Sequence, residues 1–200
     1  HLAAMKFSAE AIIEQYPLDT MQPGDVYVLN DPYKGGTHIN DITFLSPIFF
    51  DGDIIAFAVS RGHWMDLGGG AAGGQAFGGT HIAGEGLRLP PLKLFDAGKV
   101  REDLLAIILN NTRTPFYVKG DTQAHVGALK AATQEMERAA EKYGMATLKA
   151  AMKQLQEYTE RIVRKSIAEM PDGEYEAEEY ADTDGHSDKP IPIKDKLIIK

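Results

Sequence analysis

Two apolar runs in the first third of the chain flank a short polar break. ITFLSPIFF (residues 42–50) and DIIAFAVS (residues 53–60) are rich in the β-branched and aromatic residues that favour strands. Between them stands Asp51-Gly52, a pair suited to a two-residue type I′ turn because both central positions need a positive φ. The pattern therefore predicts a β-hairpin over about residues 42–61.

The turn also predicts which residues face each other across the hairpin. Counting outward in a regular ladder places Asn40 opposite His63. Pro47 cannot donate a ladder hydrogen bond, so it indicates an edge strand or a bulge. A one-residue bulge would place Asp41 opposite His63 instead. In both cases two H-x-x-D segments lie side by side at the open end of the hairpin.

Helical periodicity dominates the second half of the chain. It predicts a helix from Asp121, its N-cap, to residue 143, closed by Gly144, and a second helix over 146–170. The short joint between them predicts an antiparallel pair. The other expected elements are a helix that begins at Ser8 as N-cap and stops at Pro17, a strand over 26–29, an extended segment over 87–95, a buried helix over 101–111, and strands over 174–182 and 191–199.

Together these elements predict an α+β fold. We expect a mixed or antiparallel β-sheet with the hairpin at about 42–61 and a long antiparallel helical pair at about 121–170. The site-bearing α/β part would occupy residues 1–115, the helical pair 116–170, and the start of a further β-hairpin 171–200. The chain begins at His1 and ends inside an expected strand, so we expect a partial domain of a longer polypeptide.

The open end of the hairpin is the candidate chemical site. His38 and Asp41 share one side of the chain only if it turns at residues 35–38, which Gly35-Gly36 supports. With His63 they would offer two imidazoles and a carboxylate, ligands suited to Zn, Mn or Fe, and three protein ligands leave a position for water or substrate. The alternative is that two such spacings arise by chance among six histidines, with the acidic residues holding turns.

Glycine is dense from residue 62 to 86, which predicts a loop whose backbone N–H groups could approach an anion. His81 on this loop is a weaker ligand candidate. Glu85 is a possible acid or base, and a role in stabilising the turn is the alternative. No G-K-[ST] follows the glycines, so the sequence shows no nucleotide site of its own.

Several other polar or aromatic residues have structural interpretations. Asp31, before a proline, is expected to hold a turn, and Trp64 to anchor packing. His125 lies on an apolar helical stripe, where a satisfied core histidine is the expected state. Arg113 and Lys119 are expected in a loop, where they would bind anionic ligands or simply solvate it.

Composition excludes several classes of protein. The chain has 200 residues, 44% of them hydrophobic, enough for the core of one domain. A formal charge of −8 argues against nucleic-acid binding, which needs a basic surface. No apolar run is long enough to cross a bilayer, so no membrane association is expected. The absence of cysteine excludes thiolate chemistry and fits the reducing cytoplasm.

Five blocks of the chain, in order, carry a resemblance to a known family. They are GDVYVLNDPYKGGTHINDITFLSPIF, IIAFAVSRGHWMDLGG, GEGLRLPPLKLF, NTRTPFYVKGDTQAHVGALKAATQEMERAAEKYG and MPDGEYEAEEYADTDG. They resemble the hydantoinase B/oxoprolinase family (N-methylhydantoinase B-like), over nearly the whole chain. In one departure, His125 stands where relatives commonly have glutamine.

The resemblance implies an ATP-dependent opener of cyclic amides such as hydantoins, 5-oxoproline and lactams. It implies a hetero-oligomer in which an A-type subunit or domain binds ATP and phosphorylates the substrate carbonyl, and the B-type subunit completes the hydrolysis. Carried over by motif, the ligands of a divalent metal (Zn, Mn or Fe) are His38, Asp41 and His63. Asp66 would orient an imidazole or be a fourth ligand, and hydroxide formed at the metal would attack the activated carbon.

Two alternatives remain at this point. One is the carboxylase branch of the family, similar to acetone and acetophenone carboxylases, in which a phosphorylated enol meets CO2 or bicarbonate. The other is a non-catalytic subunit whose hairpin and helices serve only to dock the A-type partner. The form RGHWMDLGG (residues 61–69) favours the hydrolytic members.

Overall fold

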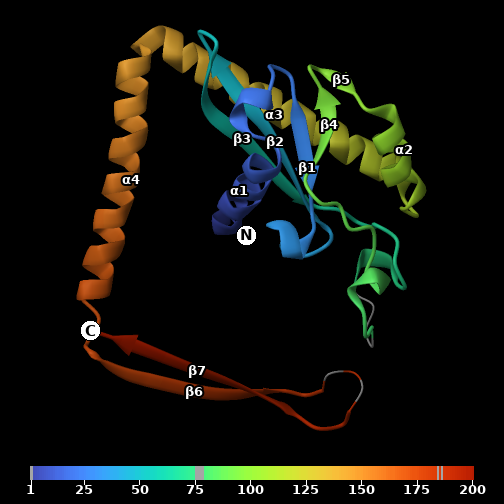
Figure 1. Ribbon diagram of the computed structural model, residues 1–200. Coiled ribbons are helices and arrows are strands. Elements are labelled where there is room, and N and C mark those ends of the chain that lie inside the picture. Colours follow the sequence, from blue (N-terminus) through green and yellow to red (C-terminus); the bar gives the residue numbers. More distant parts are fainter. Residues whose placement is uncertain (1, 75–78, 184, 186) are drawn as a thin grey trace. The chain divides into compact units, whose positions relative to one another are not determined.

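A computed structural model describes residues 2–74, 79–183, 185 and 187–200 (Figure 1). The chain separates into two compact units, His1–Ala139 and Ala140–Lys200. None of the helices in the described part of the chain is both long and apolar enough to cross a membrane.

The first unit is built on a five-stranded sheet with the strand order β3-β2-β1-β4-β5. Every neighbouring pair of strands is antiparallel, which confirms the α+β class with an antiparallel sheet. The strands are β1 (Val26–Leu29), β2 (Asp41–Phe50), β3 (Asp53–His63), β4 (Leu92–Asp96) and β5 (Lys99–Val100).

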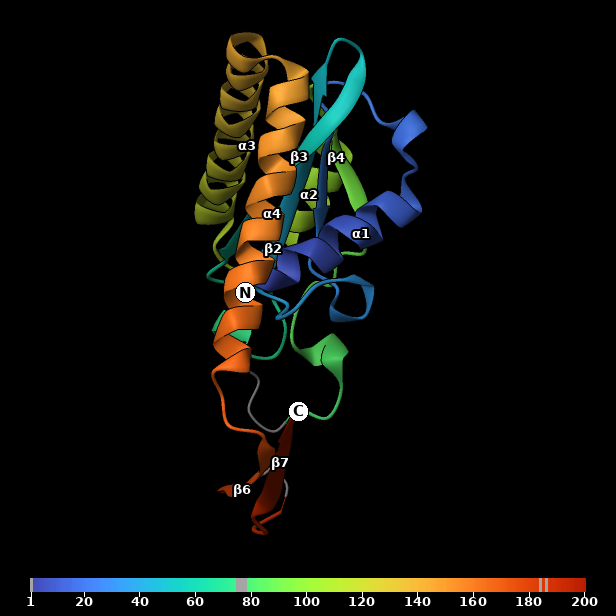
Figure 2. The same ribbon diagram turned by 90° about the vertical axis from the view of Figure 1, so that its left-hand side faces the viewer.

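Helices cover both faces of this sheet (Figure 2). Helix α1 (Met5–Gln15) lies on one face, and α2 (Glu102–Asn110) and α3 (Pro115–Tyr143) lie on the other. The first eight residues of β2 are all buried because both faces of this inner strand are covered. The α1 side of the core contains Ile12, Met21, Tyr27, Leu29 and Leu45. The α3 side contains Val28, Phe44, Ile48, Leu94, Ile108 and Leu129, among others.

The predicted hairpin is confirmed as β2 and β3. Asp51 (φ 51°) and Gly52 (φ 88°) form its turn with both residues in the left-handed region. Ile48 pairs with Ala56 and Phe49 with Ile54, so one residue of β3 is bulged out of the ladder. Asp41 consequently faces His63, as expected for the bulged register and not for the regular one.

Two helix starts differ from the sequence prediction. Helix α1 begins at Met5, so Ser8 is an interior, fully buried residue and not an N-cap. Helix α3 begins at Pro115, because proline at the first helical position costs no hydrogen bond. Asp121 and Lys119 are therefore inside α3, not at its cap and in a loop as predicted.

The helix predicted over 101–111 is also less buried than its composition indicated. Helix α2 has only Ile108 fully buried, and Ile107 is 52% exposed. A helix at the end of a sheet can bury one stripe only, so the remaining apolar residues face outward.

The second unit contains α4 (Met145–Ala168) and a two-stranded antiparallel sheet of β6 (Gly173–Ala181) and β7 (Ile191–Ile199). Helix α4 buries no residue. On the sheet, Tyr175 pairs with Leu197 and Ala181 with Ile191, so one face is mostly apolar, although it also carries Asp195 and Glu179. The other face carries ion pairs such as Lys196–Glu174. The predicted antiparallel packing of α3 and α4 stays a prediction.

Candidate metal centre

Three chain segments bring His38, Asp41 and His63 together. Asp41 is the first residue of β2 and faces His63, the last residue of β3. The backbone N–H of Asp41 donates to the carbonyl of His38 at 2.9 Å, which closes a turn and returns His38 to the side of Asp41. One ligand atom from each residue lies within 4.8 Å of the others. The predicted convergence at the open end of the hairpin is thus present.

The turn before β2 depends on glycine and on a buried amide. A Cβ at Gly36 would lie 2.2 Å from the carbonyl oxygen of Asn30, so only glycine allows the chain to pass there. Asn30 is fully buried; its Nδ2 donates to the carbonyls of Ile39 (2.6 Å) and Leu87 (2.9 Å). Its Oδ1 accepts from the N–H of Leu89 at 2.6 Å. Sequence reasoning missed Asn30, whose only signal was a polar residue directly after a buried strand.

The carboxylate of Asp41 is the electrostatic centre of the cluster. It is 5% exposed, and its two oxygens lie 2.8 Å from His63 Nδ1 and 2.9 Å from Thr37 Oγ1. Burial raises the pKa of Asp41, but the hydrogen bonds from His63 and Thr37 and the nearby imidazoles outweigh it, so the net pKa is lowered. Asp41 is therefore held ionised, the state that a metal ligand requires.

The two imidazoles face a single region. The rings of His38 and His63 are stacked, with centroids 5.1 Å apart and planes at 19°. The side chain of His63 is 56% exposed, so it can reach a ligand without moving the sheet. An open hollow borders it, lined by Leu2, Met5, Asp41, Arg61, Gly62 and His63.

This donor set fits one divalent ion. Ligand distances of about 2.0–2.2 Å put two ligands of the same ion at most about 4.4 Å apart. The spread of 4.8 Å exceeds this value by a few tenths of an ångström, so binding one ion would draw the three side chains slightly closer. Two imidazoles and an ionised carboxylate suit Zn, Mn or Fe, and the exposed side of His63 leaves room for water or substrate.

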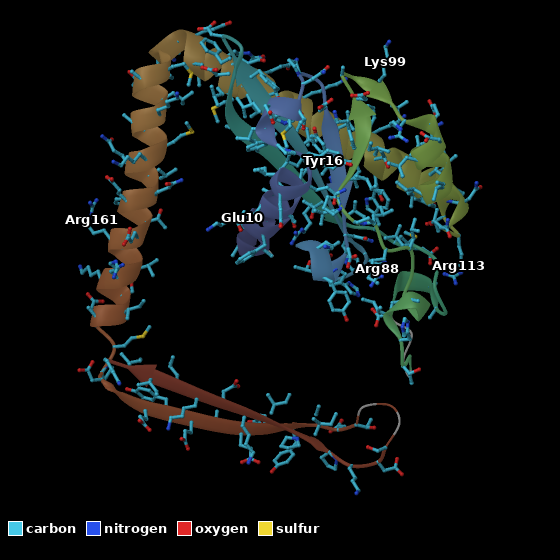
Figure 3. All side chains as sticks on the ribbon, viewed as in Figure 1. Glu10, Tyr16, Arg88, Lys99, Arg113 and Arg161 are labelled. Carbon is cyan, nitrogen blue, oxygen red and sulfur yellow. The ribbon has the colours of Figure 1, made fainter. Side chains whose placement is uncertain are left out.

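Asp66 lies away from this cluster. It is 1% exposed, and Oδ1 accepts from Arg113 Nη1 at 2.6 Å while Oδ2 accepts from the backbone N–H of Arg113 at 2.6 Å. The N–H of Gly68 adds a third bond at 3.2 Å. The predicted contact between Asp66 and an imidazole is not among these interactions. Asp66 ties the loop after β3 to the junction of α2 and α3, where Arg113 is marked in Figure 3.

His81 and Glu85 lie on the glycine-rich loop. His81 is exposed, and its Nδ1 accepts from the N–H of Ala83 at 3.1 Å. Glu85 is half-buried at the end of the same short turn. Neither belongs to the three-residue cluster found among the described residues. Residues 75–78 of this loop lie outside the described part of the chain.

The loop nevertheless touches the base of the site. A Cβ at Gly74 would lie 2.0 Å from Oδ1 of Asn40, the residue beside Asp41. Asn40 in turn donates through Nδ2 to the carbonyl of Trp64 at 2.7 Å, which joins the turn before β2 to the end of β3.

His125 and Trp64 pack behind the site, as the sequence indicated. His125 is 9% exposed and stacks on Phe44 with centroids 4.5 Å apart. Its Nδ1 lies 2.8 Å from Ser60 Oγ, and its Nε2 accepts from Trp64 Nε1 at 3.4 Å. Burial lowers the pKa of His125 and keeps the ring neutral. Asp31, which caps a short turn by accepting from the N–H of Tyr33, also has the expected structural role.

Comparisons with known proteins agree with one another. The family described as Hydantoinase B/oxoprolinase matches residues 1–200. A protein of Pseudomonas sp. (strain NS671), provisionally assigned as the B component of a D-/L-hydantoinase, is 35% identical over 182 residues, which are 90% of this chain and 30% of that protein. The beta chain of the caprolactamase of Pseudomonas jessenii is 33% identical over 182 residues, 91% of this chain and 31% of its own length.

A solved structure gives the same result. The crystal structure of the ATP-dependent caprolactamase from Pseudomonas jessenii has a TM-score of 0.94 and 30% identity, over 100% of this chain and 34% of that one. This chain thus spans about a third of the length of the relatives that it matches.

Proposed function

Because this chain belongs to the hydantoinase B/oxoprolinase family, we propose that it is the metal-bearing part of the B-type subunit of an ATP-dependent cyclic-amide hydrolase. The observation that supports this proposal most directly is the convergence of His38, Asp41 and His63 beside an open hollow. The names of the relatives, the B component of a hydantoinase and the beta chain of a caprolactamase, supply the substrate class.

In this proposal, His38, Asp41 and His63 hold a divalent ion. Such an ion supplies hydroxide near neutral pH, as metal-bound water is far more acidic than bulk water. The ionised carboxylate of Asp41 fixes His63 through its 2.8 Å contact with Nδ1. That hydroxide would add to the phosphorylated carbonyl carbon, and the ring C–N bond would break as the nitrogen takes up a proton. The acyl phosphate left behind would then be hydrolysed by a second water to a carboxylate and inorganic phosphate.

Activation of the carbonyl is assigned to a partner. The glycine-rich stretch of this chain lacks the G-K-[ST] signature of a phosphate-binding loop, and the solved caprolactamase is described as ATP-dependent. We therefore assign ATP binding and phosphorylation to an A-type subunit or domain. The B-type subunit would act within a hetero-oligomer.

Two loop residues are proposed for proton transfer. His81 is exposed and Glu85 is half-buried, and both lie on the loop whose Gly74 touches Asn40 at the base of the site. We propose that one of these two side chains exchanges a proton with the departing nitrogen. Asp66, which Arg113 engages, is proposed to anchor this loop.

Metal analysis of the complete B-type protein tests the proposal. We expect the wild type to retain about one Zn, Mn or Fe per chain after extensive dialysis, as a three-ligand site predicts, and the double variant His38→Ala/His63→Ala to lose it. His81→Ala is the matched control, an exposed histidine outside the cluster, and should keep its metal. Equal metal content in all three proteins would contradict the site.

Activity measurements with the A-type partner complete the test. ATP-dependent ring opening of hydantoin, 5-oxoproline or caprolactam should disappear in the double variant, and acetone with bicarbonate serves as the carboxylase comparison. Variants His81→Gln and Glu85→Gln should reduce kcat if these residues transfer protons. Unchanged rates in both would remove the loop residues from the mechanism, while leaving the metal assignment intact.

A further inference from the structure

The side chain of Arg61 stands beside the candidate metal centre, and nothing in the proposed metal chemistry uses it. Arg61 is two residues from His63 on the same face of β3 and faces Thr43, as His63 faces Asp41. It also lines the hollow that borders Asp41 and His63. From this placement we propose that Arg61 binds the phosphoryl group of the activated substrate, an inference that rests on the proposed function.

Three hydroxyl groups hold the guanidinium in place. Nε donates to Thr43 Oγ1 at 2.7 Å, Nη2 to Ser8 Oγ at 2.6 Å, and Nη1 to Thr37 Oγ1 at 3.4 Å. The hydroxyl of Ser8 donates its own proton to the carbonyl of Gly35. Thr37 donates to Asp41, so the guanidinium and the ligand carboxylate are joined through one hydroxyl. Arg61 is therefore oriented by α1, β2 and the turn before β2 together.

The charge of Arg61 is positioned but not neutralised. Among the described residues, no carboxylate lies within ion-pair distance of its nitrogens, although the side chain is half-buried. Burial lowers the pKa of Arg61, with Asp41 opposing this effect at longer range. Removing part of a charged group from water is costly unless another group compensates the charge. An anion brought by the substrate would supply the missing partner.

The donor geometry fits two oxygens of one phosphoryl group. A guanidinium has five N–H donors, and the three bonds to hydroxyls leave one on each terminal nitrogen. Two parallel N–H groups match phosphate oxygens in a forked, charge-assisted arrangement. In the proposed reaction the phosphoryl group is bonded to the carbonyl oxygen, one atom from the carbon under attack. Residues two apart on one face of a strand lie about 6.6 Å from each other. The guanidinium of Arg61 is therefore close enough to His63 for one phosphorylated substrate to contact both.

Phosphate binding to the complete B-type protein is the test. Inorganic phosphate is titrated calorimetrically at fixed ionic strength, with and without a chelator, into the wild type and into Arg61→Gln and Arg61→Lys. We expect Arg61→Gln to weaken phosphate binding about tenfold or more in both conditions, and Arg61→Lys to lose part of it, since an ammonium lacks the fork. Arg88→Gln is the control; Arg88 is labelled in Figure 3, its side chain is 44% exposed, and it already pairs with Asp31 at 3.5 Å. It should bind within about twofold of the wild type, because its charge already has a partner.

A second variant separates charge from tethering. Ser8→Ala removes one bond that holds Arg61 but keeps the guanidinium, so it should retain most of the phosphate affinity. If Ser8→Ala loses as much affinity as Arg61→Gln, or if Arg61→Gln binds like the wild type, the inference is overturned. Metal content is measured in parallel and should not change in Arg61→Gln. A wild type without metal or ring opening would instead overturn the proposed function.

Discussion

The carboxylates of Asp41 and Asp66 are both nearly fully buried, and each depends on a different cationic or hydrogen-donating neighbour. Asp41 accepts from His63 and Thr37 at the open end of the hairpin. Asp66 accepts from both the backbone and the guanidinium of Arg113. A buried carboxylate must be satisfied by donors, and these two differ in what they hold: Asp41 holds the imidazole of His63, whereas Asp66 holds a loop. Two identical H-x-x-D spacings therefore have different roles.

Gly62, between Arg61 and His63, gives a prediction at the scale of single residues. A Cβ at this position would lie 2.8 Å from His125 Nε2, so Gly62→Ala must displace the buried imidazole. We expect a loss of roughly 1–3 kcal/mol in the free energy of unfolding, the usual cost of overpacking. The measurement is urea unfolding followed by the fluorescence of Trp64, the sole tryptophan.

The double variant supplies the control for Gly62→Ala. In a His125→Ala background the obstructing imidazole is gone, and adding Gly62→Ala should be neutral or stabilising, because alanine loses less backbone entropy than glycine on folding. If Gly62→Ala lowers the free energy of unfolding as much in the His125→Ala background as in the wild type, the proposed steric cause is wrong.

At the scale of elements, the hairpin β2–β3 and the loop that follows it position different groups of residues. The bulge at Ile55 of β3, opposite Ile48 and Phe49, sets the register that places Asp41 opposite His63. The loop is then attached to the α2–α3 junction by Asp66 and to β1 by Asn30, which binds the carbonyl of Leu87. The sheet positions Asp41 and His63, and the tethers position the loop that carries His81 and Glu85.

Removing the charge of Asp66 tests the tether. Asp66→Asn should lower the free energy of unfolding by roughly 2–3 kcal/mol at pH 7, less than for a fully buried pair because Arg113 is half-exposed. Burial raises the pKa of Asp66, but the hydrogen bonds from Arg113 and Gly68 outweigh this effect. The net pKa of Asp66 is therefore below its ordinary value of 3.8. The stabilisation is therefore present above pH 3.8 and is lost as pH falls through the lowered pKa.

Urea unfolding of wild type and Asp66→Asn across this acid range checks the sign. The stability difference between them should shrink as pH falls. Asp103→Asn is the control, since Asp103 forms an exposed pair with Arg101 at 2.8 Å and should change little. A difference between wild type and Asp66→Asn that does not vary with pH would show that the charge of Asp66 is not what matters.

At the scale of the whole molecule, this chain corresponds to only part of the proteins that it matches. It spans about a third of its relatives' length. One face of the β6–β7 sheet is mostly apolar and exposed, and a two-stranded sheet is marginally stable unless such a face is covered. Catalysis as proposed also needs ATP chemistry from an A-type partner.

Residues 1–200 alone should therefore show no ATP-dependent ring opening. We expect release of phosphate and opened product only when the complete B-type protein and its A-type partner are combined. The assay follows both products with hydantoin, 5-oxoproline or caprolactam as substrate. Turnover by the isolated 200-residue chain would contradict the division of labour proposed above.

Local chemistry in the sequence was sufficient to determine the hairpin, its Asp51-Gly52 turn and the approach of His38, Asp41 and His63. Turn conformation and strand alternation are decided by near neighbours, so they can be inferred without coordinates. The tertiary structure alone decided that the bulged register is used, that Asp66 pairs with Arg113, and that Arg61 is held by Ser8. These choices join residues far apart in the chain, where several partners of suitable charge exist and only packing selects among them.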